Sequence, residues 1–158
     1  MPMQSAFIGW KQEPDDYLEH ILGHDRLEKL NPIRTFRDNG IVVSFGSDAP
    51  CTTPDPIAWM DRAVNNGNAG QTVSVQDALR MCTYNGAWAA FDEQERGSLE
   101  AGKIADMAVL SENPYTVPKD KLSCLRVEGL YLSGKPYESC RENILPMMLR
   151  GLTSRNKA

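Results

Sequence analysis

One short apolar run constrains the fold of this chain more than any other feature. Residues 41–45 read Ile-Val-Val-Ser-Phe, with hardly a polar side chain among them. A continuous run of this kind is typical of a strand that is buried on both faces of a parallel sheet. It ends abruptly at the loop Gly-Ser-Asp-Ala-Pro of residues 46–50. The run therefore predicts a buried strand with a polar loop at its carboxyl end.

Helix signals lie on both sides of this predicted strand. Residues 32–39 predict a short helix, because Pro32 suits its first turn and Gly40 suits the position after its last. After the loop, Asp55 is a favourable N-cap and Pro56 a favourable first residue for the next helix. Helix, buried strand, loop and helix in this order are the pattern of an α/β barrel or of a doubly wound sheet.

The second half of the chain changes character near residue 96. Before it, Ser74 caps a predicted helix with an apolar face. After it, glycine and proline separate short segments, which predict strands at 104–110 and 126–132 and a tight turn at 133–136. A final helix is expected at 144–152. We therefore expect three parts: 1–95 from an α/β unit, 96–140 from a β-lobe, and 141–158 as a C-terminal tail.

Composition excludes several classes of function. The formal net charge is −4 and no run of Lys and Arg forms a basic patch, so we expect no nucleic-acid partner. No apolar run reaches the roughly 18 residues of a membrane span, so we expect no membrane partner. The four cysteines form no Cys-x-x-Cys pair and predict no disulfide framework, which favours a cytoplasmic location. Cys82 lies on an apolar helical face and is expected to be a buried thiol.

Two sequence blocks resemble one enzyme family. The first is Gly-Ile-Val-Val-Ser-Phe-Gly-Ser-Asp-Ala-Pro at 40–50, continued by Pro-Asp-Pro at 54–56. The second is Gly-Ser-Leu-Glu-Ala-Gly-Lys-Ile-Ala-Asp-Met-Ala-Val-Leu at 97–110. In this order they resemble the amidohydrolase superfamily, and specifically amidohydrolase family 3, a branch that includes N-substituted formamide deformylases. The linking helix is also similar, with Thr83, Asn85 and Ala87 in the order that the family uses.

The resemblance implies a fold. Members of the family combine a (β/α)₈ metal-dependent hydrolase barrel with a small β-sandwich lobe. Residues 3–7 are similar to strand seven of the barrel, residues 41–45 to strand eight, and residues 97–137 to the C-terminal share of the lobe. A complete barrel needs about 250 residues, and this chain has 158. We therefore expect a C-terminal fragment that lacks the first six barrel strands.

The resemblance also implies a chemistry. In the family, a divalent metal, usually zinc, activates water to hydrolyse an amide-like C–N bond of a small-molecule substrate. Asp48 matches the aspartate after strand eight, which shuttles the water proton and contributes to the metal site. Taken alone, Asp48 would be better explained by an Asx turn with Ala49 and Pro50. With both blocks in register, the catalytic interpretation is preferred.

Two further residues are candidates for substrate binding. Gln4 lies near the end of the expected strand seven, and Arg26 lies in the loop after it. Arg26 has an alternative interpretation as a surface ion pair with Asp25 or Glu28. Two other carboxylates are assigned structural roles, Asp106 as a hydrogen-bonding residue of the β-lobe and Asp55 as a helix cap.

The histidines that hold the family's metal have no counterpart here. The chain has only His20 and His24, neither at a matching position, and their i, i+4 spacing lacks the glutamate of the zincin motif. We expect both to be exposed, and the chain alone to bind no metal and to be inactive. The alternative is a non-catalytic binding or oligomerisation module that self-associates through exposed barrel edges.

Overall fold

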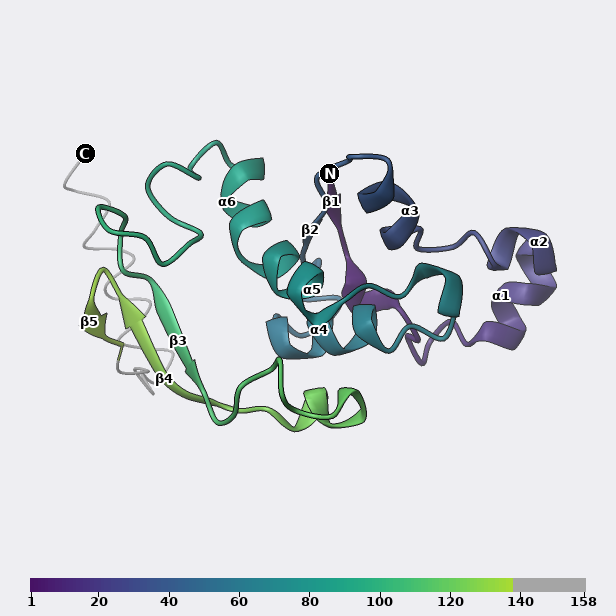
Figure 1. Ribbon diagram of the computed structural model, residues 1–158. Coiled ribbons are helices and arrows are strands. Elements are labelled where there is room, and N and C mark those ends of the chain that lie inside the picture. Colours follow the sequence, from purple (N-terminus) through teal and green to yellow (C-terminus); the bar gives the residue numbers. More distant parts are fainter. Residues whose placement is uncertain (138–158) are drawn as a thin grey trace, which may run out of the picture.

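A computed structural model describes residues 1–137 and shows a mixed α/β arrangement (Figure 1). The helix expected at 144–152 lies outside the described residues. Along residues 1–137, no helix is both long and apolar enough to cross a membrane. With 3₁₀ helices labelled η, the elements are β1 (Pro2–Met3), η1 (Ser5–Phe7), α1 (Asp15–Leu22), α2 (His24–Leu27), α3 (Ile33–Asp38), β2 (Ser44–Phe45), α4 (Pro56–Val64), η2 (Ala69–Gln71), α5 (Val75–Cys82), α6 (Tyr84–Ala89), β3 (Met107–Leu110), η3 (Lys119–Cys124), β4 (Val127–Leu132) and β5 (Lys135–Pro136).

The two predicted barrel strands pair in parallel but are shorter than expected. β1 and β2 pair with Pro2 opposite Ser44 and Met3 opposite Phe45. The expectation of a strand over residues 3–7 is wrong, because the chain turns into η1 directly after Gln4. The expected strand 41–45 is reduced to its last two residues. Regular strand geometry requires a partner ladder, and each of these segments has one neighbouring strand within residues 1–137.

The core lies between the small parallel sheet and the helices that follow it. Asp55 caps α4 as predicted, since its Oδ1 accepts hydrogen bonds from the backbone N–H groups of Ile57 and Ala58 at 3.0 and 3.2 Å. Ser74 caps α5, and its Oγ accepts from the Asp77 N–H at 3.0 Å. The apolar faces of these helices meet in one cluster of buried residues, Ile8, Ile33, Val43, Met60, Ala63, Val64, Val73, Ala78, Met81, Leu122 and Leu125.

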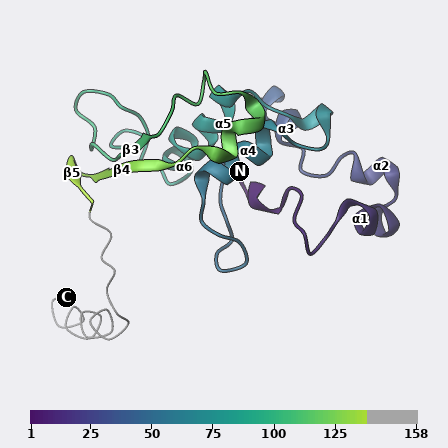
Figure 2. The ribbon, with the colours of Figure 1, turned by 90° about the horizontal axis from the view of Figure 1, so that it is seen from below.

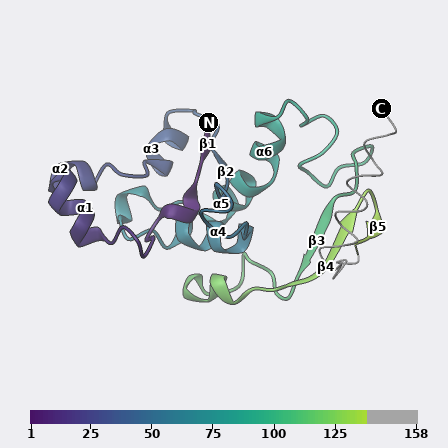
Figure 3. The same ribbon diagram turned by 180° about the vertical axis from the view of Figure 1, so that it is seen from behind.

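β3, β4 and β5 form an antiparallel sheet in this order, within the range predicted as a β-lobe (Figure 3). β4 and β5 are joined through Ser133 and Gly134, both with positive φ (51° and 76°), as a two-residue hairpin turn requires. Asp106 stabilises this turn, because its Oδ1 accepts from the Ser133 N–H at 2.8 Å and its Oδ2 pairs with Arg96 at 2.9 Å. The structural role predicted for Asp106 is confirmed.

Helices α1 and α2 form an arm that projects from the body (Figures 1 and 3). Neither helix has a buried residue. Gly23 ends α1, with a φ of +76°. The arm therefore contributes exposed side chains and little to the core.

Candidate functional site

Asp48 lies in the loop that leaves the carboxyl end of β2. Because β1 and β2 are parallel, both strands end on the same side of the small sheet. The loop between β2 and α4 stands away from the body on this side (Figure 2). Active sites of α/β proteins are built from the loops at the carboxyl ends of parallel strands. Asp48 therefore occupies the position at which the fold places reactive groups.

The backbone around Asp48 holds it in an uncommon conformation. Its φ is +55°, in the left-handed region that Asp tolerates better than most residues. The peptide bond between Ala49 and Pro50 is cis. The turn is closed by hydrogen bonds from the Cys51 N–H to the Asp48 carbonyl at 2.9 Å and from the Thr52 hydroxyl to the Ser47 carbonyl at 2.5 Å.

The Asp48 carboxylate takes no part in this turn. The Ala49 N–H bonds to the Ser47 hydroxyl at 3.2 Å, so an Asx turn does not explain Asp48. The side chain is exposed, and no residue within 1–137 donates a hydrogen bond to its carboxylate. A carboxylate in a strained turn without a local partner is available for a ligand.

Gln4 and Arg26 do not join Asp48 in one site. Gln4 is exposed at the N-cap position of η1, and Arg26 is exposed on α2 in the projecting arm. No hydrogen bond or ion pair links these three side chains within the described part of the chain. The alternative pairing of Arg26 with Asp25 or Glu28 is likewise not observed there.

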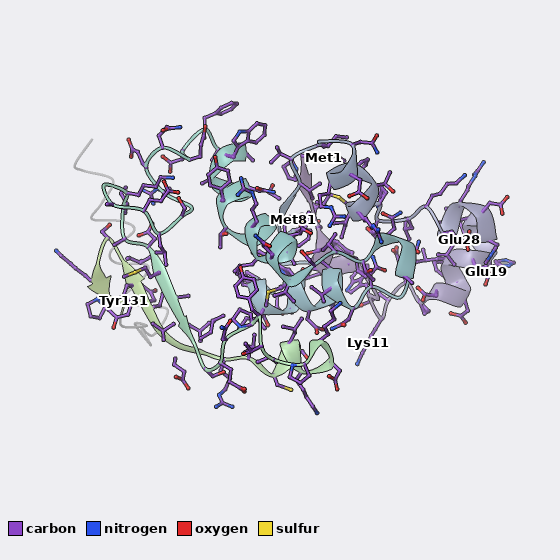
Figure 4. All side chains as sticks on the ribbon, viewed as in Figure 1. Met1, Lys11, Glu19, Glu28, Met81 and Tyr131 are labelled. Carbon is purple, nitrogen blue, oxygen red and sulfur yellow. The ribbon has the colours of Figure 1, made fainter. Side chains whose placement is uncertain are left out.

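The two histidines lie on the arm. The imidazole of His24 sits between Glu19 and Glu28, at 3.3 and 3.5 Å, and all three side chains are more than half exposed (Figure 4). His20 is exposed on α1. Across residues 1–137, no group of three or more His, Cys, Asp or Glu side chains is placed to hold a metal ion. The described residues therefore do not fit the divalent metal that the sequence resemblance implies.

A separate cleft of about 800 Å³ lies between the arm and the end of α4. Arg62 forms part of its wall, and its guanidinium donates to the carbonyl groups of Ala6 and Ile8, the latter at 3.1 Å. Gln4, Arg26 and Asp48 do not line this cleft. The cleft therefore does not unite the three candidate residues.

Sequence reasoning did not identify the residue that anchors the start of β2. The side-chain amide of Asn85, on α6, donates to the Val43 carbonyl at 2.7 Å and is only 8% exposed. Asn85 was noted as part of a family-like helix, but nothing local in the sequence marks an amide that reaches a distant strand. Cys82, which was predicted to be buried, is partly buried, and this burial raises the pKa of its thiol to about 12.

Comparison with known proteins agrees with the sequence resemblance. Residues 2–137 match the model of a family described as the amidohydrolase family. The chain is 36% identical over 136 residues to an N-substituted formamide deformylase of Arthrobacter pascens, covering 82% of this chain and 23% of that protein. It is 29% identical over 124 residues to the putative amidohydrolase YtcJ of Bacillus subtilis, covering 72% and 23%.

Solved structures of related enzymes share this fold. An amidohydrolase from Thermotoga maritima superposes with a TM-score of 0.55 at 25% identity, over 67% of this chain and 25% of that chain. A metal-dependent hydrolase from Pyrococcus furiosus gives 0.56 at 26% identity, over 66% and 21%. The chain thus spans about a quarter of the length of the relatives it matches. On the evidence of this match and of its α/β structure, the chain belongs to the amidohydrolase family.

Proposed function

We propose that this chain is the C-terminal part of a metal-dependent hydrolase that cleaves amide-like C–N bonds of small molecules. The observation that carries the proposal is the Asp48 carboxylate, exposed directly after a parallel strand, with φ +55° and no bonding partner within residues 1–137. Asp48 is the proton shuttle of the reaction and one ligand of its metal site. The deformylase activity named for one relative supports an amide-like substrate.

In this proposal, β1 and β2 are strands seven and eight of a (β/α)₈ barrel. Their parallel pairing, and the helices that follow each of them, support the assignment. The sheet β3-β4-β5 is the C-terminal share of a β-sandwich lobe. Gln4 directly follows β1 and so lies at the strand ends, whereas Arg26 reaches substrate only if the rest of the barrel draws the arm over them.

The proposed catalytic centre takes most of its ligands from outside the described residues. Zinc, the metal that we propose, is held in catalytic sites by about three protein side chains. Residues 1–137 offer Asp48 and no cluster around it. A single exposed carboxylate does not bind Zn²⁺ usefully, so the 158-residue chain alone is proposed to be inactive.

The first test uses the 158-residue chain itself. We expect the purified 158-residue protein to retain well under one zinc per chain after equilibration and desalting, measured by atomic emission. We also expect no turnover of an N-substituted formamide above a metal-only blank. Stoichiometric zinc together with amide hydrolysis would overturn the proposed inactivity.

The second test concerns Asp48 itself. This test uses a longer hydrolase chain that ends in this sequence. Asp48→Asn is expected to lower its kcat by about 10²- to 10⁴-fold, the range for a general acid–base group. Its zinc content should change little, because the other ligands hold most of the metal. Asp55→Asn is the matched control, because Asp55 is exposed in the same loop but caps α4. Equal activity of the two variants would remove Asp48 from the mechanism.

A non-catalytic oligomerisation module is the second candidate. One observation favours it: β1 and β2 pair only with each other among the described strands, so each has an unpaired edge there. Unpaired edges promote association between chains. Sedimentation velocity at increasing concentration tests this candidate. A monomer at every concentration, with no fluorescence increase from a dye that binds exposed apolar surface, would count against self-association.

A further inference from the structure

The loop that carries Asp48 is held together by its own hydrogen bonds. Within residues 1–137, every hydrogen bond of residues 47–52 lies inside this segment. Figure 2 shows the loop between β2 and α4 standing away from the body. The direction in which the Asp48 side chain leaves the backbone therefore depends on the bonds within the loop.

Three bonds make up this network. The Ser47 hydroxyl accepts from the Ala49 N–H at 3.2 Å, and the Asp48 carbonyl accepts from the Cys51 N–H at 2.9 Å. Both are short-range contacts along the chain. The third bond runs from the Thr52 hydroxyl to the Ser47 carbonyl at 2.5 Å and spans five positions. The Thr52 side chain thus ties the two ends of the segment together.

The backbone conformation of Asp48 needs such a tie. Its φ of +55° lies in the left-handed region, where a residue other than glycine persists only when its surroundings fix it. Thr52 is partly buried, and a hydrogen bond is stronger where water is partly excluded. The bond from Thr52 is therefore well suited to hold Asp48 in this conformation.

We propose that Thr52 is a positioning residue, whose hydroxyl holds the loop in the conformation from which the Asp48 carboxylate acts. The inference rests on the proposed function, because it concerns the reaction that Asp48 is proposed to serve. Thr52 itself does not donate to substrate, since its one hydroxyl proton is donated to the Ser47 carbonyl. Catalytic groups keep a productive geometry only when supporting hydrogen bonds of this kind hold them.

Thr53 offers a matched control. It is the same residue type, lies next in the chain and is exposed. Within the described residues its hydroxyl makes no hydrogen bond, and only its carbonyl accepts, from the Asp55 N–H at 2.9 Å. Thr53→Val therefore makes the same chemical change without breaking a bond of the loop. Thr52→Ser keeps the hydroxyl and is the conservative variant.

The first measurement follows the loop in the 158-residue chain. Thr52→Val should raise the solvent-exchange rate of the Cys51 amide, measured by NMR, by about two- to tenfold, because loss of one hydrogen bond loosens the turn that this amide closes. Thr52→Ser and Thr53→Val should leave the rate unchanged. Amides of α4 and α5 report intact folding and should not change. An unaltered Cys51 rate in Thr52→Val would overturn the proposal.

The second measurement uses a longer hydrolase chain that ends in this sequence. Thr52→Val should lower kcat by about 10- to 10²-fold through misplacement of the carboxylate, with KM little changed and activity restored in Thr52→Ser. In an Asp48→Asn background the same change should have no further effect, because Thr52 acts through Asp48. An equal loss of kcat in both backgrounds would show a merely structural role and refute the inference.

Failure of this inference can be told apart from failure of the proposed function. If Asp48→Asn is inactive while Thr52→Val is as active as Thr53→Val, the positioning role of Thr52 is overturned and the proposed function stands. If Asp48→Asn keeps full activity, the proposed function fails, and the role of Thr52 falls with it.

Discussion

The buried amide of Asn85 holds the carbonyl of Val43 at 2.7 Å, across 42 positions of sequence. Val43 leads into β2, and β2 leads to Asp48. On its other side, β2 is held by β1. The Asn85 amide thus supplies a hydrogen bond to a segment that has only one neighbouring strand within residues 1–137. It also fixes the segment that leads into the loop carrying Asp48.

Loss of this amide should destabilise the protein. Asn85→Leu leaves the Val43 carbonyl buried without a donor, which costs about 1–3 kcal/mol. Urea denaturation followed by circular dichroism measures the change. Asn39→Leu is the control, because the Asn39 amide also donates to a backbone carbonyl, at 2.8 Å, but at an exposed position. Its effect should stay within about 0.5 kcal/mol. Equal losses in both variants would contradict the assigned role of Asn85.

Local signals in the sequence predicted the helices well. Asp55 and Ser74 were assigned as caps, and each is found in that role. These features depend on residues close in sequence, so a pattern suffices to find them. The ends of β1 and β2 were misplaced, because strand length depends on pairing partners far along the chain. The Asn85 contact was missed for the same reason. The role of Asp48 stays a prediction.

The pair Arg37–Asp77 links α3 to α5 at 2.5 Å and should make stability depend on pH. Burial raises the pKa of Asp77, but hydrogen bonds from Ser74 and Arg37 outweigh it and hold the pKa below its ordinary value. Because the pKa of Asp77 is lowered in the folded state, the Arg37–Asp77 pair contributes its full share to the free energy of unfolding above the unfolded pKa of about 3.9. It is lost as the pH falls through the folded pKa.

Arg37→Ala should therefore lower the free energy of unfolding by about 1–2 kcal/mol at pH 6 and by much less near pH 2. Urea titrations at both pH values measure this. The control is Arg34→Ala, since Arg34 pairs with Asp38 at 3.4 Å with both side chains 49% exposed, and exposed pairs contribute about 0–1 kcal/mol. A loss in Arg37→Ala that does not change with pH would contradict the assignment.

The thiol of Cys82 should be unreactive in the folded protein. With its pKa raised to about 12 by burial, about one thiol in ten thousand is ionised at pH 8, and the thiolate is the reactive form. Cys51 and Cys124 are exposed. Brief treatment with iodoacetamide and peptide mass mapping should show these two labelled and Cys82 unlabelled until denaturant is added. Labelling of Cys82 at the rate of Cys51 would show that it is not buried.

Gly97 marks the junction between α6 and the β-lobe, where the chain passes close to the helix. A Cβ at Gly97 would lie 2.6 Å from the Ala87 Cβ and 3.1 Å from the Tyr84 Cα, and the φ of Gly97 is +90°. Gly97→Ala combines overpacking with an unfavourable backbone conformation, so it should cost about 2–4 kcal/mol. Gly86, within α6, meets nothing within 4 Å of its Cβ position.

Gly86→Ala is therefore the matched control, and it should raise stability by up to about 1 kcal/mol through helix propensity. The double variant Gly97→Ala with Ala87→Gly separates the two causes at Gly97. Removal of the Ala87 methyl relieves the steric conflict but not the positive φ, so part of the loss should return and part should remain. Full recovery would assign the requirement for glycine to packing alone, and no recovery would assign it to the backbone.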